Sequence, residues 1–274
     1  MEDVQNQKAL VEKEIERVGI KGLTYPIILV MRCSGDAEIK KENISAEVDM
    51  YVTLPKEFRG THMSRFVELL HEEHTSLDPH DLETITWRLL DRLHSIKAEI
   101  SLRFTLFICK KAPITGIQSF MSYECMFTCV QALLGKPVSK IQVKVPIMSV
   151  CPCSVEISDF GAHNQRCNVT VDVEVDKSKG ILWLEDLIEA VEKCGSSPLY
   201  SVLKRPDEKF ITEMSYLKPV FVEDIARNVA KILDTFVNII QYEIKVESEE
   251  SIHNHQAYAY IKEDRGSYAH KRST

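Results

Sequence analysis

The chain has 274 residues, of which 44% are hydrophobic and 27% are charged, and its formal net charge is −7 at neutral pH. This balance is typical of a soluble globular protein and excludes the disordered and fibrous classes. The negative charge argues against a general nucleic-acid coat, because phosphate binding needs a basic face. One small phosphorylated ligand held by a few local cations stays compatible with it.

Residues 1–19 are charged and polar, without the apolar centre of a secretory signal, and no apolar run is long enough to span a membrane. We therefore expect a cytoplasmic protein that does not bind membranes. Eight cysteines in such a chain favour buried thiols and a metal ligand over disulfides. Six of them lie among apolar or strand-like residues and are expected to be structural: Cys33, Cys109, Cys125, Cys129, Cys167 and Cys194.

The first half of the chain predicts the order strand, strand, helix, helix, strand, strand. Residues 25–31 form an apolar run, and residues 46–52 and 100–108 alternate apolar and polar side chains, as half-buried strands do. Between them, residues 63–70 and 85–93 carry apolar side chains at helical spacing. A further strand-like run covers residues 122–134.

The second half repeats this order. Alternating strands are predicted at 141–147 and 169–175, helical faces at 184–191 and 222–236, and strands at 242–246 and 257–261. The boundary falls near Gly135, so we expect one module in residues 1–135 and a second in residues 136–274. Sequential strands with a pair of helices predict an α+β layer with an antiparallel sheet, whose open edges oligomerisation could close into a barrel. The alternative is two unrelated α+β domains.

The stretch from Cys151 to Arg166 gives the strongest indication of chemistry. It opens with Cys151, Pro152 and Cys153, and it contains His163 before a strand-like segment. Because Pro152 interrupts a strand ladder, we expect an exposed turn where a strand ends. A thiolate, an imidazole and a third ligand from elsewhere would make an open transition-metal site. The alternative is a pair of buried thiols and a surface histidine.

A second polar cluster, residues 250–255, directly follows the last long alternating strand. On an extended segment, His253 and His255 would point to the same side. Such a pair suits a metal site or proton transfer, and the alternative is a solvated polar loop. His71 and His74 are spaced like a helical metal pair but lack a nearby third ligand. No glycine-rich phosphate loop is present, so a nucleotide would have to be held by other means.

Residues 203–209 are a third candidate, read as a charged loop between the helices of the second half. Glu208 lies among the cations Lys204 and Arg205, which suits a metal ligand or part of an anion-binding face. Solvated surface is the alternative for a charge run of this kind. Glu223 opens the last predicted helix, where capping is its default role.

Taken together, these segments resemble the prokaryotic GTP cyclohydrolases of type IB. The match keeps its order over nearly the whole chain and is carried by residues 60–66, 151–154, 161–166, 203–209, 221–224 and 250–253. The resemblance implies two tandem tunnelling-fold modules, each a four-stranded antiparallel sheet with two helices between its second and third strands. It also implies a homotetramer with sites between subunits. The implied reaction converts GTP and water to formate and 7,8-dihydroneopterin triphosphate, the first step of folate biosynthesis.

The resemblance also implies roles for individual residues. A divalent metal, zinc or manganese with ferrous iron as an alternative, would be held by Cys151, His163 and Glu208. It would lower the pKa of a water that attacks C8 of the guanine. Proton transfer is expected from His253 and His255, with Glu250 orienting one of them.

The remaining implied roles concern the substrate. Glu223 would accept the guanine N1–H and 2-amino group, and Cys153 would contact the base or an intermediate. The cations expected at the triphosphate are Arg65, Lys204, Arg205 and Arg166. Two related reactions are alternatives: an archaeal-type cyclohydrolase that makes a cyclic phosphate with iron, and a nitrile reductase with a cysteine nucleophile and NADPH. A metal-binding scaffold that is not an enzyme is a third, and it would unfold on metal removal.

Overall fold

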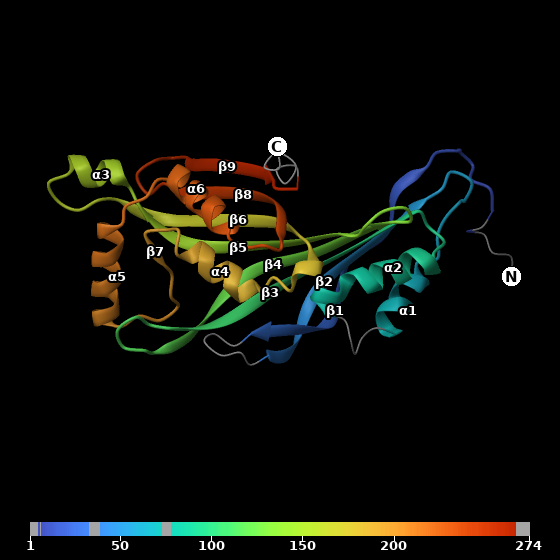
Figure 1. Ribbon diagram of the computed structural model, residues 1–274, viewed down its shortest axis with the longest axis horizontal. Helices are drawn as coiled ribbons and strands as arrows, with labels where there is room; N and C mark the ends of the chain where they lie inside the picture. The colour runs from blue at the N-terminus through green and yellow to red at the C-terminus, as the bar shows by residue number, and fades with distance from the viewer. Residues whose placement is uncertain (1–4, 6, 33–38, 73–77, 267–274) are drawn as a thin grey trace, which may run out of the picture. The chain divides into compact units, whose positions relative to one another are not determined.

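The computed structural model describes residues 5, 7–32, 39–72 and 78–266, and it has a mixed α+β fold with a large antiparallel sheet (Figure 1). The strands are β1 (Ile15–Arg32), β2 (Ile39–Leu54), β3 (Lys97–Lys111), β4 (Gln118–Ala132), β5 (Val138–Val150), β6 (Asn164–Val175), β7 (Ser197–Pro198), β8 (Ile239–Glu249) and β9 (Gln256–Asp264). The helices are α1 (Ser64–Glu72), α2 (Leu82–Arg92), α3 (Pro152–Ile157), α4 (Leu184–Glu192), α5 (Arg205–Leu217) and α6 (Val222–Leu233), with 3-10 turns η1 (Pro79–Asp81) and η2 (Lys177–Lys179).

The hydrogen-bonded strand order is β1-β2-β3-β4-β5-β6-β8-β9, and β7 pairs with β5. The strands and helices predicted from the apolar patterns occur in the predicted order, with additional elements in the second half. Eight of the nine strands in the described residues follow one path within a single sheet, so a division into two four-stranded sheets is not confirmed. The expected module boundary at residue 135 stays a prediction.

Two helices differ from the sequence prediction, and the two-residue strand β7 was not predicted either. The prediction of a charged loop at residues 203–209 is wrong, because helix α5 begins at Arg205. Pro206 has the backbone angle of a first helical turn, and Asp207 accepts the Lys204 N–H at 2.9 Å, which caps the helix. The short helix α3 was also not predicted, because six residues are too few to show helical periodicity.

By its internal contacts the chain divides into two compact units. Unit 1 contains Met1–Phe104 and Met126–Ile141, and unit 2 contains Thr105–Cys125 and Gln142–Thr274. The core of unit 1 lies between β2 and the helices α1 and α2. It includes the fully buried side chains Val48, Met50, Phe66, Leu70 and Leu89.

A close backbone contact fixes β1 against β2 in unit 1. A Cβ atom on Gly19 would lie 2.0 Å from the Met50 carbonyl oxygen, so only glycine fits there. Ion pairs also join the two helices, because Arg92 contacts both Glu68 and Glu72.

Unit 2 contains the candidate site, and its core lies under α4 and α6. Along β5, β6 and most of β8 every second residue is buried, and Val145, Val171 and Ile244 are fully so. Helix α6 packs on β8 and β9 and buries Ile225 and Val229 (Figure 1). None of the helices in the described residues is long and apolar enough to cross a membrane.

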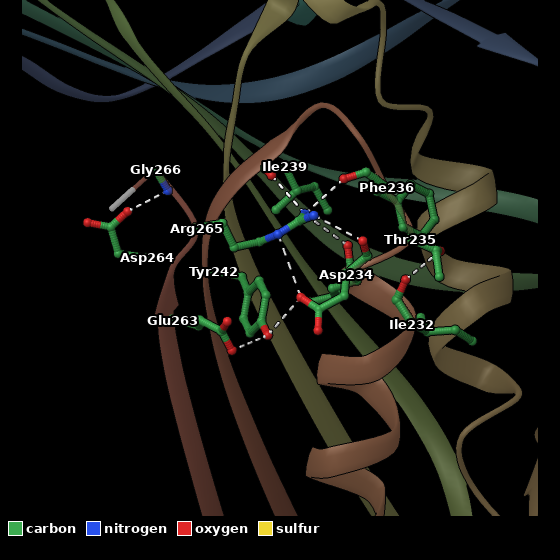
Figure 2. Close-up of polar contacts among 11 residues, drawn as sticks. Ile232, Asp234, Thr235, Phe236, Ile239, Tyr242, Glu263, Asp264, Arg265 and Gly266 are labelled. Atoms are coloured by element: carbon green, nitrogen blue, oxygen red, sulfur yellow. Dashed lines mark hydrogen bonds and ion pairs between the residues drawn. The ribbon is translucent and has the colours of Figure 1, made fainter. Parts of the chain in front are cut away.

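Arg265 fixes the end of α6 to the last strand of unit 2 (Figure 2). Its Nη1 donates to the carbonyl oxygens of Phe236 and Ile239 at 2.9 Å, and its Nη2 donates to that of Asp234 at 2.9 Å. These carbonyls follow the last helical turn, where a cation is favoured by the helix dipole. Tyr242 contacts the same region, since its hydroxyl lies 3.3 Å from the Asp234 carboxylate.

We expect Arg265→Ala to lower the free energy of unfolding by about 1–3 kcal/mol, because several carbonyl oxygens lose a charged donor. The measurement is chemical denaturation followed by circular dichroism. Arg227→Ala on α6 is the matched control, since Arg227 is exposed and its ion pair within the described residues is with Asp224 at 3.6 Å, and it should cost less than about 0.5 kcal/mol. Equal costs for the two variants would contradict a special role for Arg265.

Candidate functional site

The candidate site begins where β5 ends. Pro152 occupies the first turn of α3, and Cys151 is the half-buried residue before that helix. The Cys151 N–H donates to the His163 carbonyl oxygen at 3.1 Å, and the His163 N–H donates to Ser154 Oγ at 3.2 Å. The backbones of the predicted thiol and imidazole ligands are therefore joined directly. The expected end of the strand before Cys151 is confirmed, but a short helix stands where a turn was expected.

The His163 imidazole is held by a polar network that spans β6 and the end of β8. Its Nδ1 lies 2.9 Å from Gln165 Oε1 and 3.9 Å from Glu250 Oε2, and its side chain is 13% exposed. Glu250 Oε1 in turn accepts hydrogen bonds from Ser248 Oγ at 2.9 Å and from Gln165 Nε2 at 3.3 Å. Because both neighbours of Nδ1 are acceptors, Nδ1 carries the proton in the neutral ring and Nε2 has the free lone pair. This is how a metal-ligating histidine is usually oriented.

Sequence reasoning missed Gln165 and Ser248 as members of this network. A signal was available for Gln165, since residues two apart on a strand share a face and Gln165 follows His163 in that way. The structure also corrects the partner expected for Glu250. Its carboxylate contacts His163, whereas its described hydrogen bond with His253 joins only the backbones, at 3.3 Å.

His253 and His255 lie together in the turn between β8 and β9, and both are exposed. Their rings are stacked, with centroids 5.1 Å apart and an interplanar angle of 23°. The expected pairing of the two side chains is present, although a turn and not a strand positions them. Two adjacent imidazoles on an exposed turn can pass a proton to or from a ligand.

The first turn of α5 carries three further predicted residues, Lys204, Arg205 and Glu208, all exposed. Between them Asp207 is fully buried. Burial by itself would raise the pKa of Asp207, but hydrogen bonds from Thr115, Lys204 and Ile114 lower it well below its ordinary value. Asp207 is therefore a structural carboxylate at the centre of an exposed charged segment.

The three predicted metal ligands are not assembled in the chain as it stands. Helices α3 and α5 lie at the same end of unit 2 (Figure 1). However, no group of three or more His, Cys, Asp or Glu side chains that could hold a metal occurs in the described part of the chain. Cys151 and His163 fit a metal by their chemistry and by the orientation of the imidazole, and Glu208 as the third ligand stays a prediction.

The remaining predicted substrate residues, Glu223 and Arg65, lie on helices α6 and α1. Glu223 is exposed in the first turn of α6, but Asp224 is the residue that accepts the Phe221 N–H, at 3.3 Å. Capping therefore belongs to Asp224, and Glu223 makes no hydrogen bond or ion pair with the other described residues. Arg65 is half-buried in α1 of unit 1. His74, the weaker metal candidate, lies outside the described residues.

The cysteines fall into two groups. Cys125, Cys129, Cys167 and Cys194 are buried as expected, and burial raises the pKa of Cys125 to about 12 and those of Cys167 and Cys194 to about 11. Cys153 is exposed. The structural role predicted for Cys109 is wrong, because this thiol is exposed. It lies on one face of β3, and the buried Leu106 lies on the other face of the same strand. Cys33 lies outside the described residues.

Solved structures of known proteins share the fold. The uricase from Bacillus fastidious superposes with a TM-score of 0.54 at 6% identity, covering 95% of this chain and 96% of that one. The urate oxidase from Bacillus subtilis 168 gives 0.52 at 8% identity, covering 91% and 99%. At this identity the likeness shows the fold alone. It places the chain in the α+β class to which these enzymes belong.

The sequence relatives are more specific. The chain is 44% identical to the GTP cyclohydrolase FolE2 of Thermosipho africanus over 96% of its length and 98% of the relative. It is 45% identical to that of Kosmotoga olearia over 95% and 98%. The family model described as type I GTP cyclohydrolase FolE2 matches residues 1–259. The chain belongs to the type I GTP cyclohydrolase FolE2 family.

We expect a thiol reagent at pH 8 to label Cys153 and Cys109 within the folded protein and to leave Cys125, Cys167 and Cys194 unmodified. The buried thiols have raised pKa values, so few thiolates are present at that pH, and reagent cannot reach them. Mass spectrometry of the labelled peptides is the measurement, with the denatured protein as the control. Rapid labelling of Cys167 before unfolding would show that the His163 network opens in solution.

Proposed function

We propose that this protein converts GTP and water to formate and 7,8-dihydroneopterin triphosphate, the first step of folate biosynthesis. Membership of the FolE2 family supports this reaction over the cyclic phosphate and nitrile-reducing alternatives. The observation that carries the proposal is the Cys151–His163 backbone pair, with His163 Nδ1 held by Gln165 and close to Glu250. This arrangement joins the backbones of a thiol residue and an imidazole residue, and it leaves the imidazole Nε2 lone pair available to a ligand.

The proposed cofactor is a divalent metal, zinc or manganese with ferrous iron as an alternative, bound by Cys151, His163 and Glu208. Thiolate, imidazole and carboxylate are a donor set that such ions accept. When bound, the metal would lower the pKa of a water molecule so that a nucleophile is available near neutral pH. Gln165 and Glu250 keep the imidazole in the tautomer that presents Nε2.

The proton transfers are assigned to side chains around this pair. The reaction opens the imidazole ring of guanine and then releases formate, so protons must move more than once. His253 and His255, stacked in an exposed turn, are proposed to accept and return these protons. Cys153, exposed on α3, is proposed to contact the base or the ring-opened formamide.

Substrate recognition is assigned to Glu223 and a set of cations. A carboxylate accepts two adjacent N–H donors, and Glu223 is free for this role because Asp224 caps the helix. Lys204 and Arg205, at the start of α5, are proposed to bind the triphosphate. Arg65 of unit 1 is proposed to act in the same way.

For the assembly we propose a homotetramer built from two tandem tunnelling-fold modules per chain, residues 1–135 and 136–274, with sites between subunits. Support comes from the strand order, in which β1 and β9 each have one neighbour among the described strands. Unpaired edges of this kind are available for pairing with another copy. Light scattering after gel filtration measures the mass.

Replacement of a proposed ligand should abolish the reaction without unfolding the protein. We expect Cys151→Ala and Glu208→Ala each to lower formate release from GTP by at least about 100-fold, comparable to the loss of one strong stabilising contact in a transition state. Formate and fluorescent pterin are measured after chelation and re-supply of single metals. Exposed Glu213→Ala, in the same helix α5, is the matched control and should keep full activity. Full activity in a ligand variant would remove that residue from the site.

Glu223→Gln should weaken GTP binding by about 10-fold or more, because an amide replaces one of two acceptor oxygens with a donor. Calorimetry with GTP and with inosine triphosphate, which lacks the 2-amino group, gives the comparison. Wild-type protein should prefer GTP and the variant should lose that preference. An unchanged preference would show that guanine is read elsewhere.

A further inference from the structure

Asp207 makes more contacts than a helix cap requires. Its Oδ1 accepts the N–H groups of Ile114 and Thr115, both at 2.9 Å, and its Oδ2 accepts the Thr115 hydroxyl at 2.7 Å and the Lys204 N–H at 2.9 Å. Only the bond from Lys204 is local to the helix. The other three join the first turn of α5 to the turn between β3 and β4, which is distant in the sequence.

The segment before α5 is attached to the same hairpin at two more places. Lys110 Nζ on β3 donates to the Leu199 carbonyl at 2.9 Å and to both oxygens of Glu192 at 2.8 Å. The Tyr123 hydroxyl on β4 donates to Glu192 at 2.7 Å. Lys110 and Glu192 are only 13% and 10% exposed, so the network is largely desolvated.

A further attachment lies between Leu199 and Asp207. Ser201 Oγ donates to the Phe120 carbonyl oxygen at 2.6 Å. The chain from Leu199 to Asp207 is therefore fixed to the β3–β4 hairpin at its beginning, in its middle and at its end. The side chains of Lys204, Arg205 and Glu208 are exposed, so the bonds that hold this segment among the described residues act through its backbone and through Asp207.

We propose that Asp207 is a positioning residue, which holds Lys204, Arg205 and Glu208 in register with the β3–β4 hairpin so that they meet metal and triphosphate. The inference rests on the proposed function of these three neighbours. Ligand and cation side chains must be held within about half an ångström of a productive geometry. Asp207 restricts the positions of these side chains by fixing the backbone on both sides of it.

An asparagine at this position cannot replace the carboxylate. It has one acceptor oxygen, and its amide group is a donor that would face N–H or O–H donors. Asp207→Asn therefore leaves some of the four donors unpaired. Asp176→Asn is the matched control, because Asp176 Oδ1 also accepts a backbone N–H and a hydroxyl, both from Ser178, at an exposed turn of the same unit.

The test compares three properties of full-length wild type, Asp207→Asn, Thr115→Val and Asp176→Asn. Hydrogen exchange reports the amides of Ile114, Thr115 and Lys204, competition titration with Zn²⁺ reports metal affinity, and steady-state kinetics separate KM for GTP from kcat. In Asp207→Asn we expect faster exchange at the three amides, about 10- to 100-fold weaker Zn²⁺ binding and a raised KM, with native circular dichroism. Asp176→Asn should match wild type in all three.

Thr115→Val removes a single hydroxyl donor and keeps the inference testable if Asp207→Asn does not fold. Its Zn²⁺ affinity should fall about fivefold, the change expected for one ordinary hydrogen bond. Wild-type Zn²⁺ affinity and KM in the folded Asp207→Asn variant, or in Thr115→Val if that variant alone folds, would overturn the positioning role. Absence of formate release by the metal-loaded wild type would instead overturn the proposed function.

Discussion

The hydrogen bond from the Cys151 N–H to the His163 carbonyl oxygen is the interaction on which the candidate site depends. Pro152 cannot continue the β5 ladder, so the chain leaves the sheet at Cys151 and turns into α3. It returns to the sheet at β6, directly after His163. The backbone hydrogen bond joins the two ends of the segment between β5 and β6. Two residues that are distant in the sequence therefore become neighbours at the ends of two strands.

The groups around this bond differ in how firmly they are held. His163 is fixed by Gln165 on β6 and by Glu250 directly after β8, and both side chains are largely buried. His253, His255 and Glu223 are exposed and are supported only by local structure. A ligand-binding group gains from rigid support, whereas a group that exchanges protons with solvent must stay accessible. The division of roles proposed above follows this difference in burial.

Apolar residues that alternate were enough to predict most strands, and apolar residues at helical spacing predicted the helices α1, α2, α4 and α6, because burial of one face dictates the period of each element. The same reasoning failed at Arg205, where a helix begins inside a run of charges. There Asp207 caps the helix through the Lys204 N–H, and its further contacts with Thr115 join residues far apart in the sequence, which no local pattern contains. The partner of Glu250 was hidden for a similar reason. It depends on the β6–β8 register, in which Cys167 pairs with Ser248 and Gln165 therefore comes opposite Glu250.

The fold shared with urate oxidases does not define the reaction, since one fold serves many chemistries and function resides in the site. Within the site, the two halves of the proposed ligand set have separate supports. The positions of Cys151 and His163 depend on the backbone hydrogen bond that joins the ends of the segment between β5 and β6. The position of Glu208 depends on the β3–β4 hairpin through the contacts of Asp207. If the ligands are as proposed, a metal bound to Cys151, His163 and Glu208 links the two parts of the fold that position them. Its binding free energy would then add to the stability of the native state, because the unfolded chain presents no such pair of fixed groups.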